Sequence, residues 1–540
     1  MSSTFFGLEL SSRALGAQQA ALNITGHNIS NANTQGYTRQ IGNLTATTPD
    51  TIPIAGRNLS LGSGVTLDTI TRARDAFVDR QFRSETSKQQ YWAGRQDSLS
   101  KVEGILNEPS DNSLSNDMNQ FWTSWSDLSK DPENMGARSV VRERAQTLID
   151  SFHNIAQQVS DMRGNMDSTI KVQAQQINSY GLQIKALNDE IKQAEVTGDN
   201  PNDLRDQRDS LVDDLSKIVS VRVVETKDPS FTDRKVNNFK IIIGNDNSSN
   251  NNTLVDDSTV RVLKDPPPQN TEGFSRVVWS DDPTNTNVDL GTKLGTLSAN
   301  IEVRDQYLVN FGGQFDTLAQ GMASAVNALH QTGQGLTAET QPDPVLGAIG
   351  IDFFTNGLNP NSSIPPALPV ITAATINLNF EIQKDVNRIA TGTIPMDNTT
   401  NLPTHALNSD GSMLVTAGDG SIAQGISSLS SGWNSLKSLI AAGKFGPVGQ
   451  NPVSASSLGD YYGANVAQMG VDVQQANRMK AGEDVLVTNV TNQRESSSGV
   501  SLDEEMTNLI KFQKSYSAAA RMVTMMDDML STILNMGITK

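Results

Sequence analysis

The sequence predicts an α+β multidomain protein: a long helical coiled-coil or bundle stalk built from both chain termini, with inserted β-rich outer domains. Proline, which breaks helices, is absent from residues 1–48 and 453–540, although the chain has 20 prolines. Both of these ends carry apolar residues at heptad spacing. Between Pro229 and Pro403 the sequence is rich in turn residues and short β-branched runs. Helix at both ends with strands in the middle implies that the two ends meet.

Length and composition narrow the class of protein. A chain of 540 residues is too long for one hydrophobic core and predicts several domains. The net charge of −17 argues against a nucleic-acid partner. No apolar run reaches the roughly 20 residues that span a membrane, so no membrane partner is expected. The chain has no cysteine, which excludes disulfides, thiolate metal sites and cysteine nucleophiles. Residues 1–40 lack the basic start and compact apolar stretch of a signal peptide, so we expect any export to use none.

The N-terminal segment predicts a helix with two apolar rows. Leu8, Leu15, Leu22 and Ile29 recur every seven residues and form one ridge. A second row lies roughly opposite and comprises Leu10, Ala14, Ala17, Ala21 and Ile24. Two apolar rows indicate that the helix has two sets of neighbours, because an ordinary surface helix has a single apolar row. The helix should end near Asn28–Asn31, where Asn and Ser side chains compete for backbone hydrogen bonds.

The C-terminal segment predicts a longer heptad helix. Its first row is Leu502, Leu509, Tyr516, Val523 and Leu530, and a second row three residues later is Phe512, Ala519, Met526 and Ile533. Glu505 interrupts the apolar pattern, and Met506 can replace it on the adjoining face. Ser501 and Glu504 make a capping box at the start of the helix. Gly537 suits its end.

The middle of the chain alternates between helix and strand. Helices are expected over residues 71–107, 112–129, 136–197, 202–219 and about 296–332, and again from Ser421. Strands are expected at Val221/Val223, 239–243 and Val260/Val262. The expected domains are a terminal coiled-coil core (1–48 with 499–540), a helical bundle (49–219 with 296–335 and 421–498), a β-rich domain (220–295) and a β-rich or irregular outer segment (336–420).

No catalytic motif is evident. The four histidines stand in unrelated segments, and the sequence has no nucleophile elbow, dinucleotide fingerprint or phosphate-binding loop. A dense group of carboxylates comprises Asp203, Asp206, Asp209, Asp213 and Asp214. These alternate with Arg205 and Arg208, which favours a solvated helix face with ion pairs along it. We therefore expect no enzyme activity, no cofactor and no metal site.

The segment from Ser30 to Arg39 is the most specific motif. It reads as a helix cap and loop in which Asn31, Asn33 and Thr34 are polar, Gly36 permits a tight turn, and Tyr37 anchors it. The segment resembles the motif that begins the axial proteins of bacterial flagella. Three further stretches, 202–212, 318–333 and 499–506, resemble the flagellar hook-associated protein 1 (FlgK) family.

The resemblance implies a structural subunit of the extracellular flagellum that forms the hook–filament junction. It implies self-assembly in a helical ring, contacts with the hook protein and the next junction protein, type III export, and a FlgN-type export chaperone on the C-terminal helix. The expected assembly interface comprises Leu8, Leu15, Leu22, Ile29, Asn31, Asn33, Thr34, Gly36, Tyr37, Leu502, Leu509, Phe512, Tyr516, Val523, Met526, Leu530 and Ile533. We expect the terminal core to be disordered in the free monomer and to fold on assembly.

Three alternatives remain from the sequence alone. The chain could be another axial protein, such as a hook or filament subunit. It could be an extracellular adhesin with a helical stalk, although aromatic residues make up only 5% of it. It could be an enzyme carried on an axial scaffold, which the missing motifs disfavour.

Overall fold

The helices form where the heptad patterns predict them. The computed structural model describes residues 6–54, 57–111, 113–231, 236–244, 252–336, 350–357, 370–393, 418–431 and 457–538. The N-terminal helix α1 is Phe6–Asn31 and the C-terminal helix α12 is Leu502–Ile538. The other long helices are α2 (Ala76–Leu106), α3 (Leu114–Lys130), α4 (Met135–Thr197), α5 (Asn202–Ile218), α7 (Leu308–His330) and α11 (Leu458–Ser498). Short helical segments are α6 (Gly295–Glu302), α8 (Phe380–Lys384), η2 (Val386–Arg388) and α9 (Ser421–Ser428).

The helix expected over about 296–332 forms without a break as α6, a π-helical turn η1 at Val303–Tyr307, and α7. Helix α12 extends to Ile538, one residue past the Gly537 expected at its end. The predicted start of α12 is confirmed, because the Glu504 backbone N–H donates to Ser501 Oγ over 3.4 Å.

The predicted β-rich segment after α5 forms a four-stranded antiparallel sheet. Its strands, in spatial order, are β5 (Val221–Lys227), β6 (Asn237–Ile243), β7 (Thr253–Asp256) and β8 (Thr259–Val260). The sheet packs on α4, whose Gly181 lies beside Leu254 and Val260. The predicted heptad residues Ile177, Ile184 and Ile191 of α4 are buried here, as is Ile170 earlier in the helix.

The sequence prediction missed the strands between α1 and α2. Strand β1 (Gln40–Ala46) pairs antiparallel with β4 (Val65–Arg72), and β2 (Asp50–Ile54) pairs with β3 (Arg57–Leu61). Their sequences are rich in Thr and Asn and do not alternate cleanly between apolar and polar residues. Two-residue strands β9 (Gly333–Gln334), β10 (Phe354–Thr355), β11 (Asn377–Leu378) and β12 (Gly392–Thr393) form two further small pairs.

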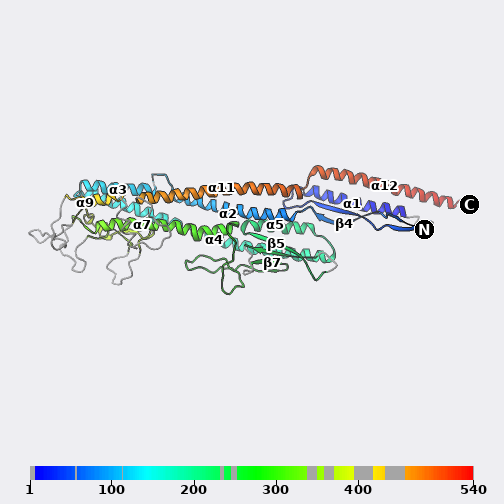
Figure 1. The fold of residues 1–540 in the computed structure, drawn as a ribbon, viewed down its shortest axis with the longest axis horizontal. Helices are drawn as coiled ribbons and strands as arrows, with labels where there is room; N and C mark the ends of the chain where they lie inside the picture. The colour runs from blue at the N-terminus through cyan, green and yellow to red at the C-terminus, as the bar shows by residue number, and fades with distance from the viewer. Residues whose placement is uncertain are drawn as a thin grey trace, which may run out of the picture. The chain divides into compact units, whose positions relative to one another are not determined.

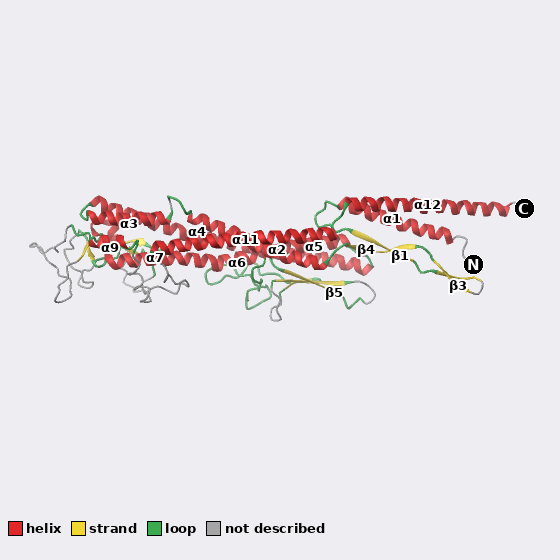
Figure 2. Ribbon diagram, turned by 45° about the horizontal axis from the view of Figure 1, so that its top comes forward, coloured by secondary structure: helices red, strands yellow, loops and turns green. Residues whose placement is uncertain are grey.

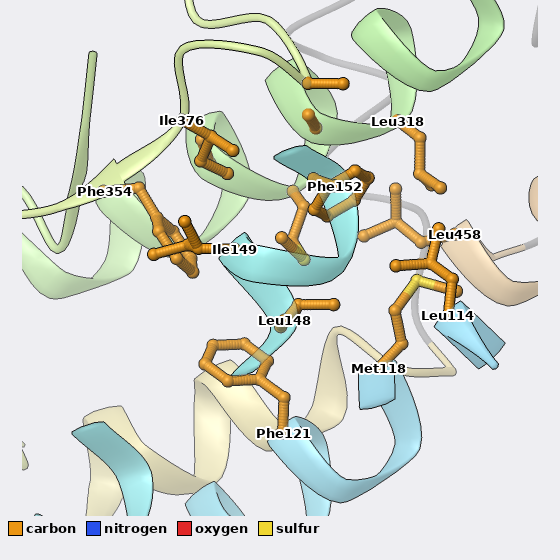
Figure 3. Close-up of a cluster of buried hydrophobic side chains, with 14 of the residues drawn as sticks. Leu114, Met118, Phe121, Leu148, Ile149, Phe152, Leu318, Phe354, Ile376 and Leu458 are labelled. Atoms are coloured by element: carbon orange, nitrogen blue, oxygen red, sulfur yellow. The ribbon is translucent and has the colours of Figure 1, made fainter. Parts of the chain in front are cut away.

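The chain divides into two compact units, and α2, α4 and α11 contribute residues to both. Unit 1 comprises Met1–Trp92, Lys171–Ser298 and Lys480–Lys540; unit 2 comprises Ala93–Ile170 and Ala299–Met479. The core of unit 2 lies among α3, α4, α7 and the first turn of α11, where Phe121, Phe152 and Phe354 meet Leu318 and Leu458 (Figure 3).

A buried histidine and a buried arginine hold the segment 386–391 in unit 2. The Ala390 backbone N–H donates to His330 Nε2 over 2.9 Å, and His330 Nδ1 lies 2.6 Å from the Ile351 carbonyl. The Arg138 guanidinium donates to the Ile389 carbonyl at 2.6 Å and to Thr391 Oγ1 at 3.0 Å. Burial lowers the pKa of His330 to about 4, so the imidazole is neutral and accepts the Ala390 hydrogen bond.

In unit 1 the two terminal helices lie side by side (Figures 1 and 2). The β1–β4 pair runs along α1 on another side (Figure 2). Leu10 Cδ1 lies 3.1 Å from the position that a Cβ on Gly64 would occupy. Ile24 Cδ1 lies 2.8 Å from the position that a Cβ on Gly42 would occupy. Strand β1 and the residue before β4 therefore cover Ile24 and Leu10, two members of the second apolar row of α1. The second set of neighbours that the two rows predict includes these residues of the same chain.

Candidate assembly site at the paired termini

Helices α1 and α12 pair antiparallel in one register. Met526 Cε lies 1.7 Å from the point that a Cβ on Gly7 would occupy, so only glycine fits there without a shift of the methionine. At the other end of the pair, Asn28 Nδ2 donates to Glu505 Oε2 over 3.2 Å. Asn28 is 21 residues after Gly7, and Glu505 is 21 residues before Met526. The two helices therefore advance by equal numbers of residues between these contacts.

The spacing of these two contacts shows which residues of α1 and α12 face each other between them. Stepping by sevens from Gly7 and Met526 brings Ala14 opposite Ala519 and then Ala21 opposite Phe512. Ala21 is 5% exposed, and the other three are half-buried. Small residues on α1 let the helix axes approach closely. The α1 residues nearest α12 are thus Gly7, Ala14, Ala21 and Asn28. Each lies one residue before a member of the predicted Leu8 ridge.

Glu505 explains the apparent defect in the heptad pattern of α12. Its side chain is buried, and its two oxygens accept hydrogen bonds from Asn28 Nδ2 and, at 2.8 Å, from Arg39 Nε. Arg39 Nη1 also reaches Glu504 over 2.9 Å, and its backbone N–H donates to the Ser498 carbonyl over 3.0 Å. A buried polar contact of this kind fixes the register of a helix pair. The Asn28–Glu505–Arg39 contact is named the register contact below.

Tyr37 completes the register contact from the loop. Its hydroxyl donates to Asn28 Oδ1 over 2.7 Å, and the Gln40 backbone N–H donates to the same oxygen over 2.9 Å. Burial raises the pKa of the Tyr37 phenol well above its usual value, and nearby carboxylates, including Glu505, raise it further. The hydroxyl therefore stays protonated and remains a donor. This confirms the predicted anchoring role of Tyr37 in the loop.

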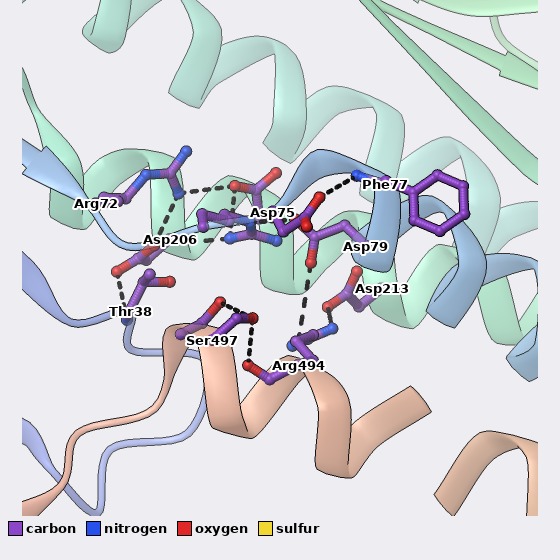
Figure 4. A network of polar contacts seen from close by, with 12 residues as sticks. Thr38, Arg72, Asp75, Phe77, Asp79, Asp206, Asp213, Arg494 and Ser497 are labelled. Carbon is purple, nitrogen blue, oxygen red and sulfur yellow. Dashed lines mark hydrogen bonds and ion pairs between the residues drawn. The ribbon is translucent and has the colours of Figure 1, made fainter. Parts of the chain in front are cut away.

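The carboxylates of α5 form a buried ionic cluster with arginines from other segments (Figure 4). The cluster comprises Arg72, Arg74, Arg83 and Arg494 with Asp79, Asp206, Asp209 and Asp213. The interpretation of these aspartates as a solvated face is wrong for Asp206, Asp209 and Asp213, which are buried, as is Arg208. It holds for Asp203, which is exposed, and for Asp214, whose side chain is 41% exposed.

Asp209 is the centre of the cluster. Its carboxylate lies 2.8 Å from both Arg72 Nη1 and Arg74 Nη1 and 3.4 Å from Arg83 Nη2. Burial alone raises the pKa of the Asp209 carboxyl, but these guanidinium groups outweigh it and hold the pKa well below its usual range. Four arginines face four aspartates, so the cluster has no excess charge to bury.

The ionic cluster joins the helix pair to its surroundings in unit 1. Arg494, near the end of α11, lies 2.8 Å from Asp213 Oδ2, and its guanidinium stacks over Phe82 at 4.4 Å. The Thr38 backbone N–H donates to Asp206 Oδ2 over 2.9 Å. The loop that carries Tyr37 and Arg39 is therefore fixed to α5, and α11 is fixed next to it (Figure 4).

The predicted interface residues occupy three kinds of place. Half-buried side chains on the two helices are Leu8, Leu15, Leu22, Ile29, Leu509, Phe512, Val523, Met526 and Leu530. Exposed ones are Leu502, Tyr516 and Ile533. In the loop, Asn31 Nδ2 donates to the His27 carbonyl over 3.0 Å, and Thr34 Oγ1 donates to Asn31 Oδ1 over 3.2 Å. Gly36 has a φ of +80°, which glycine adopts without strain, and Asn33 is exposed.

The sequence pattern predicts neither the ionic cluster nor the role of Asn28. The available signal was the spacing of Asp206, Asp209 and Asp213, which places all three on one side of α5. Their partners come from residues 72–83 and 494, far away in the chain, and no local pattern pairs them. Among the residues that the structure describes, no group of three or more acidic or histidine side chains is placed to hold a metal ion. In the same residues, no helix has an apolar stretch long enough to cross a membrane.

Three models of known protein families match parts of the chain. The family model described as the flagellar hook-associated protein FlgK helical domain matches residues 99–354. The model of the flagella basal body rod protein matches residues 8–38, which include most of α1 and the Tyr37 loop. The model of the flagellar basal body rod FlgEFG protein C-terminal region matches residues 492–536, which include most of α12.

Relatives match over nearly the whole chain. The sequence is 30% identical to flagellar hook-associated protein 1 of Bacillus subtilis, and the alignment covers 99% of each chain. It is 27% identical to flagellar hook-associated protein 1 of Escherichia coli over 96% of this chain and 98% of that one. The solved structure of the flagellar hook junction protein FlgK from Burkholderia pseudomallei shares the fold, with a TM-score of 0.58 at 16% identity, and the match covers 78% of this chain and 100% of that one. The full-length identity to the Bacillus protein shows that this chain belongs to the flagellar hook-associated protein 1 (FlgK) family, the structural proteins of the hook–filament junction.

Proposed function

We propose that this chain builds the hook–filament junction by self-assembly through α1 and α12. One observation carries the proposal. Helix α12 has 37 residues, yet among its described side chains the only one that is fully buried is Glu505. All its described apolar side chains are partly or largely exposed. A long helix of this kind needs further partners, because exposed contiguous apolar surface marks an interaction site.

The exposed apolar residues of α12 suit other copies of the chain. They are Leu502, Met506, Ile510, Tyr516, Met522, Met525, Met529, Ile533 and Leu534. Neighbouring subunits in a helical ring present the same helices repeatedly, so each copy offers the surface that the next one needs. Helix α12 packs on α1, and its exposed apolar residues, called its outer face below, are available to pack between subunits.

The exposed apolar surface of α12 also favours a terminal core (1–48 with 499–540) that is disordered before assembly. Each ordered residue loses about 1–2 kcal/mol of backbone entropy, and the half-buried seam of one helix pair recovers little of it. Burial of the outer face by neighbours supplies the missing hydrophobic free energy. A segment of this kind folds as it binds.

The partners in this proposal follow from the place of assembly. The chain contacts the hook protein on one side and the next junction protein on the other. The exposed apolar side of α12 also requires cover before export, which suits a FlgN-type chaperone on this helix. Export then proceeds through the flagellar type III apparatus without a cleaved signal peptide, and the assembled protein lies in the extracellular flagellum as a structural subunit rather than an enzyme.

An outer-face substitution tests the assembly role. Met525 is exposed in the single chain, so Met525→Asp leaves the two units folded while it places a charge in the proposed contact between subunits. We expect the purified variant to unfold like the wild type and to leave isolated hooks without a junction in electron micrographs. Met525→Leu is the matched control and is expected to bind hooks normally. Occupancy of hook tips by the Asp variant at wild-type concentration would contradict the proposal.

A further inference from the structure

Two carboxyl groups meet where α2 and α11 pack together within unit 1. The side chains of Glu85 and Glu483 are hydrogen-bonded to each other. Glu483 is half-buried, and no N–H or alcohol hydroxyl of the described residues donates to its buried Oε2. Beside this pair, Gln89 Nε2 donates to Asp484 Oδ1 over 2.8 Å, so the two helices are in direct contact here. The hydrogen-bond partner of the Glu483 carboxyl is therefore another carboxyl.

A hydrogen bond between two carboxyl groups needs a proton, because an ionised carboxylate only accepts. We propose that Glu85 and Glu483 share one proton and form a pH-sensitive switch between α2 and α11. While the proton is held, the pair joins the two helices. Loss of the proton leaves two carboxylates facing each other, which repel in a partly buried site and weaken the contact between the helices.

The switch is defined in the free chain. Both α2 and α11 lie outside the terminal core (1–48 with 499–540), so the pair does not rest on the proposed function. Residues 499–501 alone separate α11 from α12. Opening of the switch therefore loosens the helix that α12 follows.

The charged groups around the pair leave it with an excess of negative charge once the proton is lost. Lys88 Nζ lies 3.2 Å from both oxygens of the Glu85 carboxylate, which leaves the shared proton to Glu483. On α11, Lys480 lies 2.8 Å from Asp484, and this ion pair is complete in itself. One lysine on α2 therefore faces two carboxyl groups, and it cannot neutralise both.

The contact between the helices should weaken as the pH rises. Burial, and then the charge of Glu85, raise the pKa of Glu483 above its ordinary value of 4.5, and Lys88 offsets part of the rise. Above pH 4.5 the unfolded chain releases this proton while the folded pair still holds it. Stability is therefore lost as the pH rises from 4.5 through the raised pKa. The buried His330 of unit 2 acts in the opposite direction, because its pKa is lowered.

Hydrogen exchange of the full-length chain tests the switch. The quantity compared is the protection factor, which corrects for the pH dependence of exchange itself, at about pH 5 and about pH 8. From the lower to the higher pH, residues 481–490 of α11 should lose protection about threefold or more relative to α5. The effect is modest because solvent screens the half-buried Glu483. Equal relative protection at the two pH values would overturn the proposal.

Matched variants identify the group that responds to pH. Glu483→Gln keeps the shape of the side chain and supplies an amide N–H for Glu85, so residues 481–490 should be equally protected at both pH values. Asp484→Asn is the control at the same helix contact and should keep the wild-type loss. Glu85→Gln supplies the same donor from α2 and decides if Glu483→Gln does not fold. A wild-type loss in the glutamine variant, or an equally flat response in Asp484→Asn, would overturn the proposal.

Discussion

Asn28 donates to Glu505 across the antiparallel terminal helices over 3.2 Å, and this contact joins residues that are 477 positions apart in the chain. Glu505 is 2% exposed and stands where the heptad pattern calls for an apolar side chain. The contact explains why the pair has one register. Sliding by a full heptad would keep the apolar seam but would leave Glu505 without Asn28 and Arg39.

Removal of Glu505 should therefore weaken the junction. Glu505→Ala leaves the Asn28 amide and the Arg39 guanidinium without their shared acceptor, which we expect to cost about 2–3 kcal/mol after allowing for the partial exposure of Arg39. The half-saturating concentration for hook tips should rise by about 30-fold or more. Glu504→Ala is the matched control, because Glu504 binds the same arginine but its side chain is 63% exposed. An equal effect of both variants would show that burial of Glu505 is unimportant.

Asp209 should be the most sensitive position of the ionic cluster. Asp209→Ala removes the carboxylate that Arg72, Arg74 and Arg83 share and leaves one uncompensated positive charge in a buried site, so the free energy of unfolding of unit 1 should fall by about 3–5 kcal/mol. Asp214→Ala, on the same helix, removes only a surface pair with Lys217 and should change it by less than about 1 kcal/mol. Urea denaturation followed by circular dichroism measures both. Similar midpoints for the two variants would contradict the structural role of the cluster.

The stability of unit 2 should depend on pH through His330. Its pKa is lowered by burial to about 4, from an ordinary value of 6.5. Between these values the unfolded chain binds a proton that the folded chain does not, so stability falls as the pH is lowered from 6.5 towards 4. The expected loss is up to about 3 kcal/mol. Calorimetry across this range should show the loss in the wild type and a flatter profile in His330→Gln. A wild-type profile without slope in this window would contradict the buried neutral imidazole.

The terminal helices should exchange their amide hydrogens quickly in the free monomer. Residues 6–31 and 502–538 fold together with neighbours in the proposed function, whereas α4 is built into the cores of both units. Hydrogen exchange with mass spectrometry should therefore show little protection at both ends and strong protection along residues 135–197. Strong protection of residues 6–31 in solution would mean that the helix pair folds without partners.

Local patterns in the sequence predicted the helices and much of the loop. Heptads predicted α1, α4 and α12, and Asn31, Gly36 and Tyr37 predicted the end of α1 and the turn after it. What remained hidden depends on contacts between distant segments. The burial of Asp209 is set by Arg72, Arg74 and Arg83, which no spacing rule connects to it. The role of Glu505 is set by Asn28, which itself reads as a helix-ending residue. The strands β1 and β4 gain their apolar cover from α1 rather than from a pattern of their own.

The register of the terminal pair is the central claim, and engineered cysteines test it directly because the natural chain has none. Ala14→Cys with Ala519→Cys joins positions that the register places opposite each other. Ala14→Cys with Met526→Cys keeps the same helix faces but is displaced by seven residues, or about 10 Å, which is too far for a disulfide. In flagella isolated from cells that make each variant, the account predicts a cross-link within each chain for the first pair and none for the second. Cross-linking of the displaced pair, or failure of the first pair alone, would contradict it.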